Sequence, residues 1–101
     1  MKIRSVATLV IISLAFTTSA TAAEKTYTAA VVKKHSTQKS CWTIVGKNVY
    51  DLTKFIQKHP GGAGFILSIC GKNGTAMFNG QHRGEGRPTM EISRYKIGRL
   101  A

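Results

Sequence analysis

Acidic residues are scarce in this sequence, which has only four: Glu24, Asp51, Glu85 and Glu91, against 15 lysines and arginines. The formal net charge of +11 favours acidic proteins or anionic surfaces as partners. Nucleic acid is not expected, because the charges are scattered along the chain and because we predict export below. The alternative is that the positive surface only keeps the protein soluble.

The sequence also lacks an apolar run of the ~20 residues that a membrane-spanning helix requires. The run at residues 6–16 is broken by Thr8 and Ser13, follows a basic start, and precedes small residues at 20–23. We therefore predict a secretory signal peptide at residues 1–23 and a mature domain at residues 24–101. The mature domain is expected to be periplasmic if the source is bacterial and otherwise secreted, with no stable membrane insertion. An uncleaved anchor is the alternative.

Cysteine is limited to Cys41 and Cys70, so only one intramolecular pairing exists. The two are too far apart to form the Cys-x-x-Cys-His attachment of a c-type haem. Because an exported chain meets an oxidising compartment, we predict a structural disulfide, worth roughly 3 to 4 kcal/mol in loop closure. The alternative is a redox-active or metal-binding thiol pair, although no thiol-exchange motif lies nearby.

The mature chain has no internal repeat and no long linker, and its pattern predicts one α+β domain. Strands are expected at residues 26–28, 41–45, 49–52 and 96–100, with a tight turn at 46–48. Short helices are expected at residues 29–35, 53–58 (capped by Thr53), 65–70, 75–79 and 89–95. Because so small a domain buries only roughly 60% of its unfolded surface, a disulfide and a bound cofactor would both stabilise it.

Two histidines lie where an imidazole would be exposed. His59 ends a predicted helix before the turn Pro60-Gly61-Gly62, and His82 lies on a predicted loop. The helices between them present apolar side chains, and two imidazoles facing across an apolar pocket suit a haem iron. The alternatives are ordinary surface histidines, the class to which we assign His35, or a zinc site that also uses the cysteines.

One stretch carries a specific motif, Tyr50-Asp51-Leu52-Thr53, then Phe55, then His59-Pro60-Gly61-Gly62. With Cys41-Trp42, Gly71, Thr75, Phe78 and His82, it resembles the haem-binding core of the cytochrome b5 family, from about Tyr27 to Leu100. The resemblance implies a small mixed sheet with short helices forming a haem crevice, and a second core behind the sheet containing Trp42. It also implies one non-covalent haem b with His59 and His82 as axial ligands, and a crevice lined by Val45, Leu52, Phe55, Ile66 and Phe78.

The resemblance further implies a function in electron transfer. With an imidazole on both sides, the iron has no open position for a substrate, so we expect a monomeric electron carrier and not an enzyme. The alternative is a module of the same fold that binds haem or a small ligand such as a sterol as a signal. Such a module would be expected to have lost an axial histidine, and this chain keeps both.

The sequence departs from the familiar microsomal members in three ways. The segment from Phe78 to His82 is one residue shorter, and the segment at 83–88 is longer, which leaves open whether Met90, Ile92 and Tyr95 contribute to the pocket. The haem edge, acidic in those members, is expected here to be basic and to dock an acidic redox partner. Its basic residues are Lys58, Lys72, Arg83 and Arg87.

Overall fold

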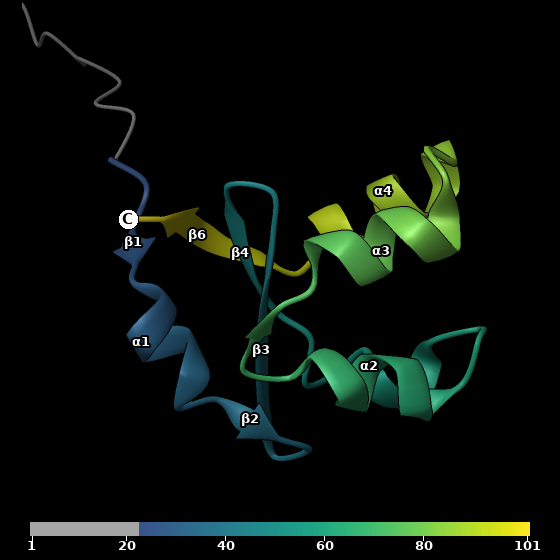
Figure 1. The fold of residues 1–101 in the computed structure, drawn as a ribbon, viewed down its shortest axis with the longest axis horizontal. Helices are drawn as coiled ribbons and strands as arrows, with labels where there is room; N and C mark the ends of the chain where they lie inside the picture. The colour runs from purple at the N-terminus through teal and green to yellow at the C-terminus, as the bar shows by residue number, and fades with distance from the viewer. Residues whose placement is uncertain (1–22) are drawn as a thin grey trace, which may run out of the picture.

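The computed structural model describes residues 23–101, so the predicted signal peptide lies outside the described residues except for Ala23. Six short strands and several short helices alternate along the chain (Figure 1). In order they are β1 (Thr26–Tyr27), α1 (Ala29–Lys33), β2 (Ser36–Thr37), β3 (Ser40–Val45), β4 (Asn48–Asp51), the 3₁₀ turn η1 (Ile56–Lys58), α2 (Ala63–Ile69), β5 (Lys72–Asn73), α3 (Thr75–His82), α4 (Gly86–Ser93) and β6 (Lys96–Leu100).

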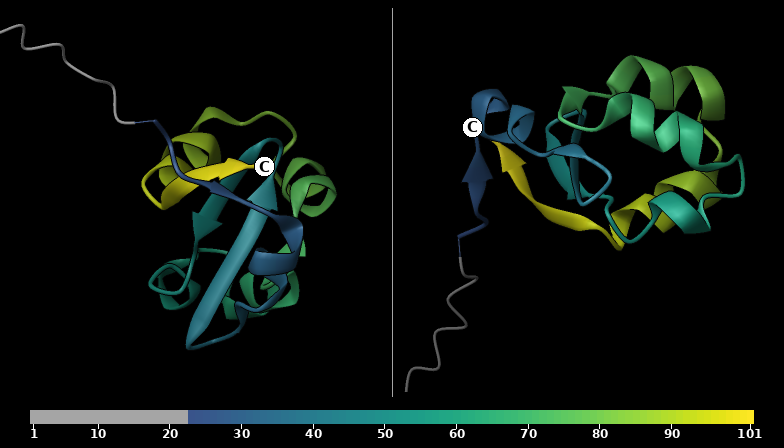
Figure 2. Two further views of the ribbon diagram at one scale, coloured as in Figure 1. Left: turned by 90° about the vertical axis from the view of Figure 1, so that its left-hand side faces the viewer. Right: turned by 90° about the horizontal axis from the view of Figure 1, so that it is seen from below.

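The strands form a mixed sheet in the order β1-β6-β4-β3-β2, and β5 pairs with β3. The β1–β6 and β3–β5 pairs are parallel, and the other pairs are antiparallel. Helices α2, α3 and α4 gather together, whereas α1 lies beside the strands at the other end of the domain (Figures 1 and 2). This arrangement confirms the predicted α+β class with a small mixed sheet.

Side chains of β3 and β4 alternate between two hydrophobic clusters, as the period of a strand requires. Cys41 and Tyr50, with Leu52 directly after β4, belong to the larger cluster, which continues into the helices. Ile44 and Val49 belong to the smaller cluster, which contains Val32 of α1 and has Trp42 packed against it. The expected second core around Trp42 is therefore present, and the larger cluster carries the helices that surround the site described below.

The predicted helix at 53–58 is wrong, because only the short turn η1 forms there. Thr53 does not cap it: its hydroxyl donates to Asp51 Oδ1 at 2.6 Å and accepts from the backbone N–H of Cys41 at 2.9 Å. Asp51 Oδ1 also accepts from the backbone N–H of Thr53 at 3.0 Å. These bonds hold a tight turn after β4 and connect it to the start of β3, so the first helical residues come later in the chain.

The last two helices also differ from expectation. α3 extends to His82, which is therefore helical and not on a loop, and it ends where Arg83 adopts a left-handed conformation at φ 42°. α4 begins at Gly86, so Pro88 lies in its first turn, where the missing N–H of proline costs no hydrogen bond. The short strands β2 and β5 were not predicted, since two-residue strands carry no periodic signal.

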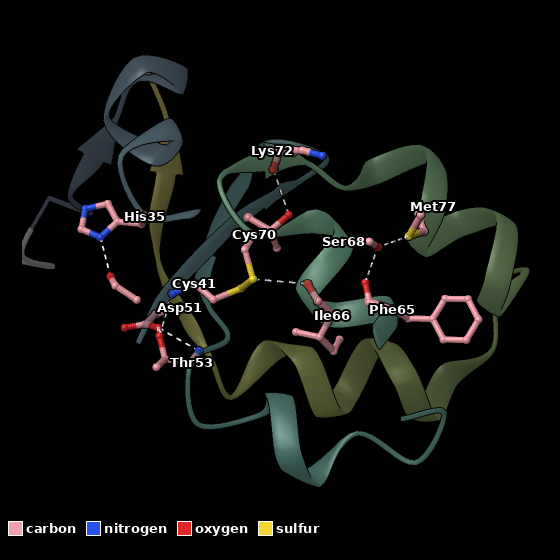
Figure 3. The surroundings of a disulfide bond; sticks show 12 residues. His35, Cys41, Asp51, Thr53, Phe65, Ile66, Ser68, Cys70, Lys72 and Met77 are labelled. Atoms are coloured by element: carbon pink, nitrogen blue, oxygen red, sulfur yellow. Dashed lines mark hydrogen bonds between the residues drawn. A yellow bond between two sulfur atoms is a disulfide. The ribbon is translucent and has the colours of Figure 1, made fainter. Parts of the chain in front are cut away.

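Cys41 and Cys70 form the predicted disulfide, which joins β3 to the end of α2, with 4.6 Å between their Cα atoms (Figure 3). Both cysteines are buried in the larger cluster. The Sγ atom of Cys70 lies 3.4 Å from the carbonyl oxygen of Ile66, one turn earlier in α2. Neither sulfur is available as a thiolate, so the disulfide removes the thiol ligands that a zinc site would need.

Within residues 23–101, no helix has the length and apolar character needed to cross a bilayer.

Candidate functional site

A hollow of about 530 Å³ lies among η1, α2, α3 and α4. Its volume falls within the ~300–1,000 Å³ typical of small-molecule and cofactor pockets. Apolar side chains make up most of its wall, and its charged side chains come from η1 and from α4 with its N-cap. The lining residues are Phe55, Lys58, His59, Pro60, Gly61, Phe65, Ile66, Ile69, Met77, Phe78, Gln81, His82, Glu85, Arg87, Pro88, Glu91 and Ile92.

His59 and His82 come together in this hollow. Their ring centroids are 6.3 Å apart, and their planes are inclined by 86°. A metal–imidazole bond is about 2 Å long. Two such bonds, plus the distance from each nitrogen to its ring centre, add up to a separation of this size.

The ring of His59 is oriented by its own turn. Its Nδ1 lies 2.8 Å from the carbonyl oxygen of Gly62. Because a carbonyl oxygen only accepts, Nδ1 carries the proton and donates, which leaves the lone pair of Nε2 for a metal. Phe55 packs against the same ring edge-to-face, with centroids 5.5 Å apart.

The two glycines after Pro60 serve different purposes. Gly62 has φ 94°, a backbone conformation that favours glycine and brings its carbonyl group to His59. Gly61 leaves room for the imidazole, since a Cβ at that position would lie 2.9 Å from Cε1 of His59. The two glycines of the sequence motif therefore position the imidazole of His59.

His82 is positioned by packing. It is the last residue of α3, and Phe78, one turn earlier, lies with its ring centroid 4.9 Å away. In the part of the chain that the structure describes, no carbonyl group accepts a hydrogen bond from the His82 ring in the way that Gly62 accepts one from His59. The two imidazoles are thus held by different means.

The other residues expected in the crevice divide into two groups. Phe55, Ile66 and Phe78 line the hollow. Val45 and Leu52 do not: Leu52 is only 1% exposed inside the larger cluster, and Val45 packs against that cluster. Both side chains therefore pack behind the residues that line the hollow.

The sequence left open whether Met90, Ile92 and Tyr95 contribute to the pocket, and the structure now places each of them. Ile92 of α4 is buried and lines the hollow. Met90 is 69% exposed, and Tyr95 packs against Phe55 with centroids 5.0 Å apart without lining the hollow. His35 is half-buried, in contrast to the ordinary surface histidine expected, and stacks on Trp42 at 3.6 Å.

The edge of the hollow is of mixed charge. Lys58 and Arg87 line it, but so do Glu85 and Glu91, which the sequence did not single out. Arg83 and Lys72 are exposed on other parts of the surface and do not line it. The sequence did not predict that the two glutamates line the hollow, because their distance from it depends on where α4 begins.

A zinc site of the usual composition finds no support in the described residues. Among residues 23–101, no group of three or more His, Cys, Asp or Glu side chains is placed to hold a metal ion. The two facing imidazoles and the apolar walls instead match the donor set and surface of a haem, whose porphyrin supplies the remaining iron ligands.

The comparisons with known proteins agree on one family. The family model of the "Cytochrome b5-like Heme/Steroid binding domain" matches residues 28–101. Cytochrome b5 of Drosophila melanogaster is 40% identical over 77 residues, covering 75% of this chain and 56% of that protein. A nitrate reductase [NADH] of Cucurbita maxima is 41% identical over 78 residues, covering 77% of this chain and only 8% of the enzyme. The chain thus spans about half of one relative and a small part of the other.

Solved structures give the same result. Cytochrome b558 of Ectothiorhodospira vacuolata, described as a prokaryotic homologue of cytochrome b5, superimposes with a TM-score of 0.70 at 32% identity. The match covers 76% of this chain and 99% of that one. Cytochrome b5 of Ostreococcus tauri virus 2 has a TM-score of 0.65 at 32% identity, covering 73% and 94% of the two chains.

Proposed function

This chain belongs to the cytochrome b5 family, and from that premise we propose that it is an electron-transfer protein whose haem iron is held between His59 and His82. Domains of this family bind haem non-covalently, and haem is the cofactor of this chain. The observation that supports the proposal most directly is the pair of imidazoles, 6.3 Å apart across an apolar hollow.

Bound haem supplies an iron that passes between its ferric and ferrous states and so carries one electron. The chain's own residues hold that iron in one geometry. The bond from His59 Nδ1 to Gly62 fixes the tautomer and increases the electron donation of Nε2. Phe55 and Phe78 pack against the two rings and restrain them. With His59 and His82 both bound to it, the iron would have no free position for a substrate.

The two histidines also separate this proposal from its main alternative, a module that binds haem or a sterol as a signal. A sensing module needs a free position on the iron or an empty pocket for its ligand. Here His82 projects from α3 towards His59, inside the hollow. We therefore favour an electron carrier with no substrate chemistry of its own.

The charge of the chain suggests the kind of redox partner. Without Lys2 and Arg4, 13 lysines and arginines remain against four acidic residues. Such an excess accelerates association with an acidic surface, and the effect decreases as salt screens the charges. We propose a monomeric carrier that docks to an acidic redox protein, with a transfer rate that falls as ionic strength rises.

We also propose that the protein is exported and loses residues 1–23. The basic start, the apolar run and the small residues at 20–23 support this proposal. The Cys41–Cys70 disulfide is consistent with an oxidising compartment. The intact mass of the protein purified from the periplasm or medium is expected to correspond to a chain beginning at Glu24.

The electron-transfer proposal is tested by a redox titration combined with carbon monoxide. The visible spectrum is expected to follow a one-electron Nernst curve, and the reduced protein is expected to keep its spectrum under carbon monoxide. Rapid stoichiometric binding of carbon monoxide would show an accessible iron position and would favour a sensing or enzymatic role.

A further inference from the structure

The cations and the carboxylates at the hollow do not form ion pairs with one another in the described part of the chain. Four of them line it: Lys58, Glu85, Arg87 and Glu91. Glu91 is accompanied by Arg94, whose Nη1 lies 3.6 Å from its carboxylate. Within residues 23–101, Lys58 and Arg87 form no ion pair with a carboxylate of the chain. Two cations therefore line this mostly apolar hollow without an ion-pair partner among the described residues.

Each of the two cations lies close in sequence to one of the two histidines. Lys58 directly precedes His59 at the end of η1, and Arg87 lies in the first turn of α4, five residues after His82. The two cations thus come from separate elements, each close in sequence to one imidazole. Both are exposed, as expected of residues at the mouth of the hollow.

A haem has two propionate carboxylates on one edge of an otherwise apolar macrocycle. In an apolar pocket, a few polar groups fix the orientation of a ligand. A carboxylate pairs most strongly with a guanidinium, which can donate two parallel hydrogen bonds, and also pairs with an ammonium group. The unpaired cations at this hollow are suited to that edge of the ligand.

We propose that Arg87 and Lys58 bind the two haem propionates and so fix how the haem lies in the hollow. This inference rests on the proposed function, because it takes haem as the ligand between His59 and His82. The residues left to attract an acidic partner are then the basic ones outside the hollow, Arg83 and Lys72 among them.

The test compares haem with its dimethyl ester, in which both propionates are blocked. Each ligand is loaded into the native protein and into Arg87→Gln and Lys58→Gln. Loss to a large excess of a second haem-binding protein then gives the dissociation rate. Lys54→Gln and Arg83→Gln are the matched controls, since each removes one exposed positive charge from a residue that does not line the hollow.

Haem is expected to leave Arg87→Gln about tenfold faster than the native protein, the effect of losing a charge-assisted hydrogen bond, and to leave Lys58→Gln a few-fold faster. The dimethyl ester is expected to leave all five proteins at similar rates. Equal acceleration of both ligands, or none, would overturn the propionate assignment while a low-spin spectrum still supported the histidine ligands. A native protein with no low-spin spectrum would overturn the proposed function and this inference with it.

Discussion

Nδ1 of His59 donates a hydrogen bond to the carbonyl oxygen of Gly62, three residues later in the chain, at 2.8 Å. The chain thus builds one side of its site from a single turn, in which Gly62 supplies the acceptor and Gly61 leaves space for the ring. His82 has no such turn and depends on its place at the end of α3, next to Phe78. The two imidazoles should therefore respond differently to substitutions around them.

Gly61→Ala should displace the His59 ring, because the added Cβ would lie 2.9 Å from Cε1. Disturbing the support of a metal ligand typically weakens binding ~10–100-fold, and we expect haem affinity to fall by about tenfold or more. Haem titration of the apoprotein measures this change. Gly64→Ala is the control, since nothing lies within 4 Å of a Cβ there. Equal affinity in both variants would mean that Gly61 does not hold the ligand in place.

Leu52 and Phe78 should separate stability from cofactor binding. Leu52→Ala removes a side chain that is 1% exposed in the core and should lower the free energy of unfolding of the apoprotein by about 2–5 kcal/mol. Phe78→Ala, at a half-buried position lining the hollow, should cost the apoprotein less and increase the rate of haem loss more. Urea unfolding and haem dissociation measure the two effects. If Leu52→Ala increased the rate of haem loss more than Phe78→Ala did, Leu52 would line the crevice, as the family resemblance implied.

Reduction of the Cys41–Cys70 disulfide should lower the free energy of unfolding by roughly 3 to 4 kcal/mol, because the open chain regains the entropy of the closed loop. Urea unfolding of the apoprotein with and without a thiol reductant measures this loss, and Cys41→Ser/Cys70→Ser provides the comparison without reductant. An unchanged unfolding midpoint after verified reduction would show that the disulfide does not stabilise the domain.

The elements that the sequence predicted correctly are those set by residues close together in the chain. The alternation in residues 41–45 and 49–52 predicted two strands, and Pro60-Gly61-Gly62 predicted the turn after His59, whose role as a ligand was implied by the family resemblance. Thr53 was misassigned as a helix cap because its hydroxyl bonds to the nearby Asp51 instead and accepts from the backbone of Cys41, which reaches it only once β3 and β4 pair. Local propensity does not report such tertiary contacts.

The same reason explains the errors around the second ligand. Gly80 and Gly84 suggested a loop around His82, yet α3 continues through Gly80 to His82. Glycine is tolerated in a helix at a cost of about 1 kcal/mol, which packing can offset. Leu52 lies in the same cluster as the lining residues Phe55 and Ile66 but behind them, and an apolar pattern does not tell which members of one cluster reach the surface of a hollow.

Glu24 should have a pKa below its usual value, because its carboxylate accepts a hydrogen bond from Lys96 at 2.6 Å, with Lys96 and Arg99 adding attractive charge. A lowered pKa stabilises the fold at a pH above the unfolded value, and this contribution is lost as the pH falls through the folded one. NMR titration of Glu24 measures it. In Lys96→Gln the pKa should return towards normal, and a titration identical to the native one would exclude this pair.

The central claim is that His59 and His82 together hold one haem iron, and visible absorption of the purified protein tests it most directly. Oxidised and dithionite-reduced spectra are recorded for the native protein and for His59→Ala and His82→Ala, with His35→Ala as the control for a histidine outside the hollow. We predict a sharp low-spin b-type spectrum for the native and His35→Ala proteins, and a high-spin spectrum or loss of haem in the other two. A native protein that stays colourless after haem is added, or a low-spin spectrum that survives both ligand substitutions, would contradict this account.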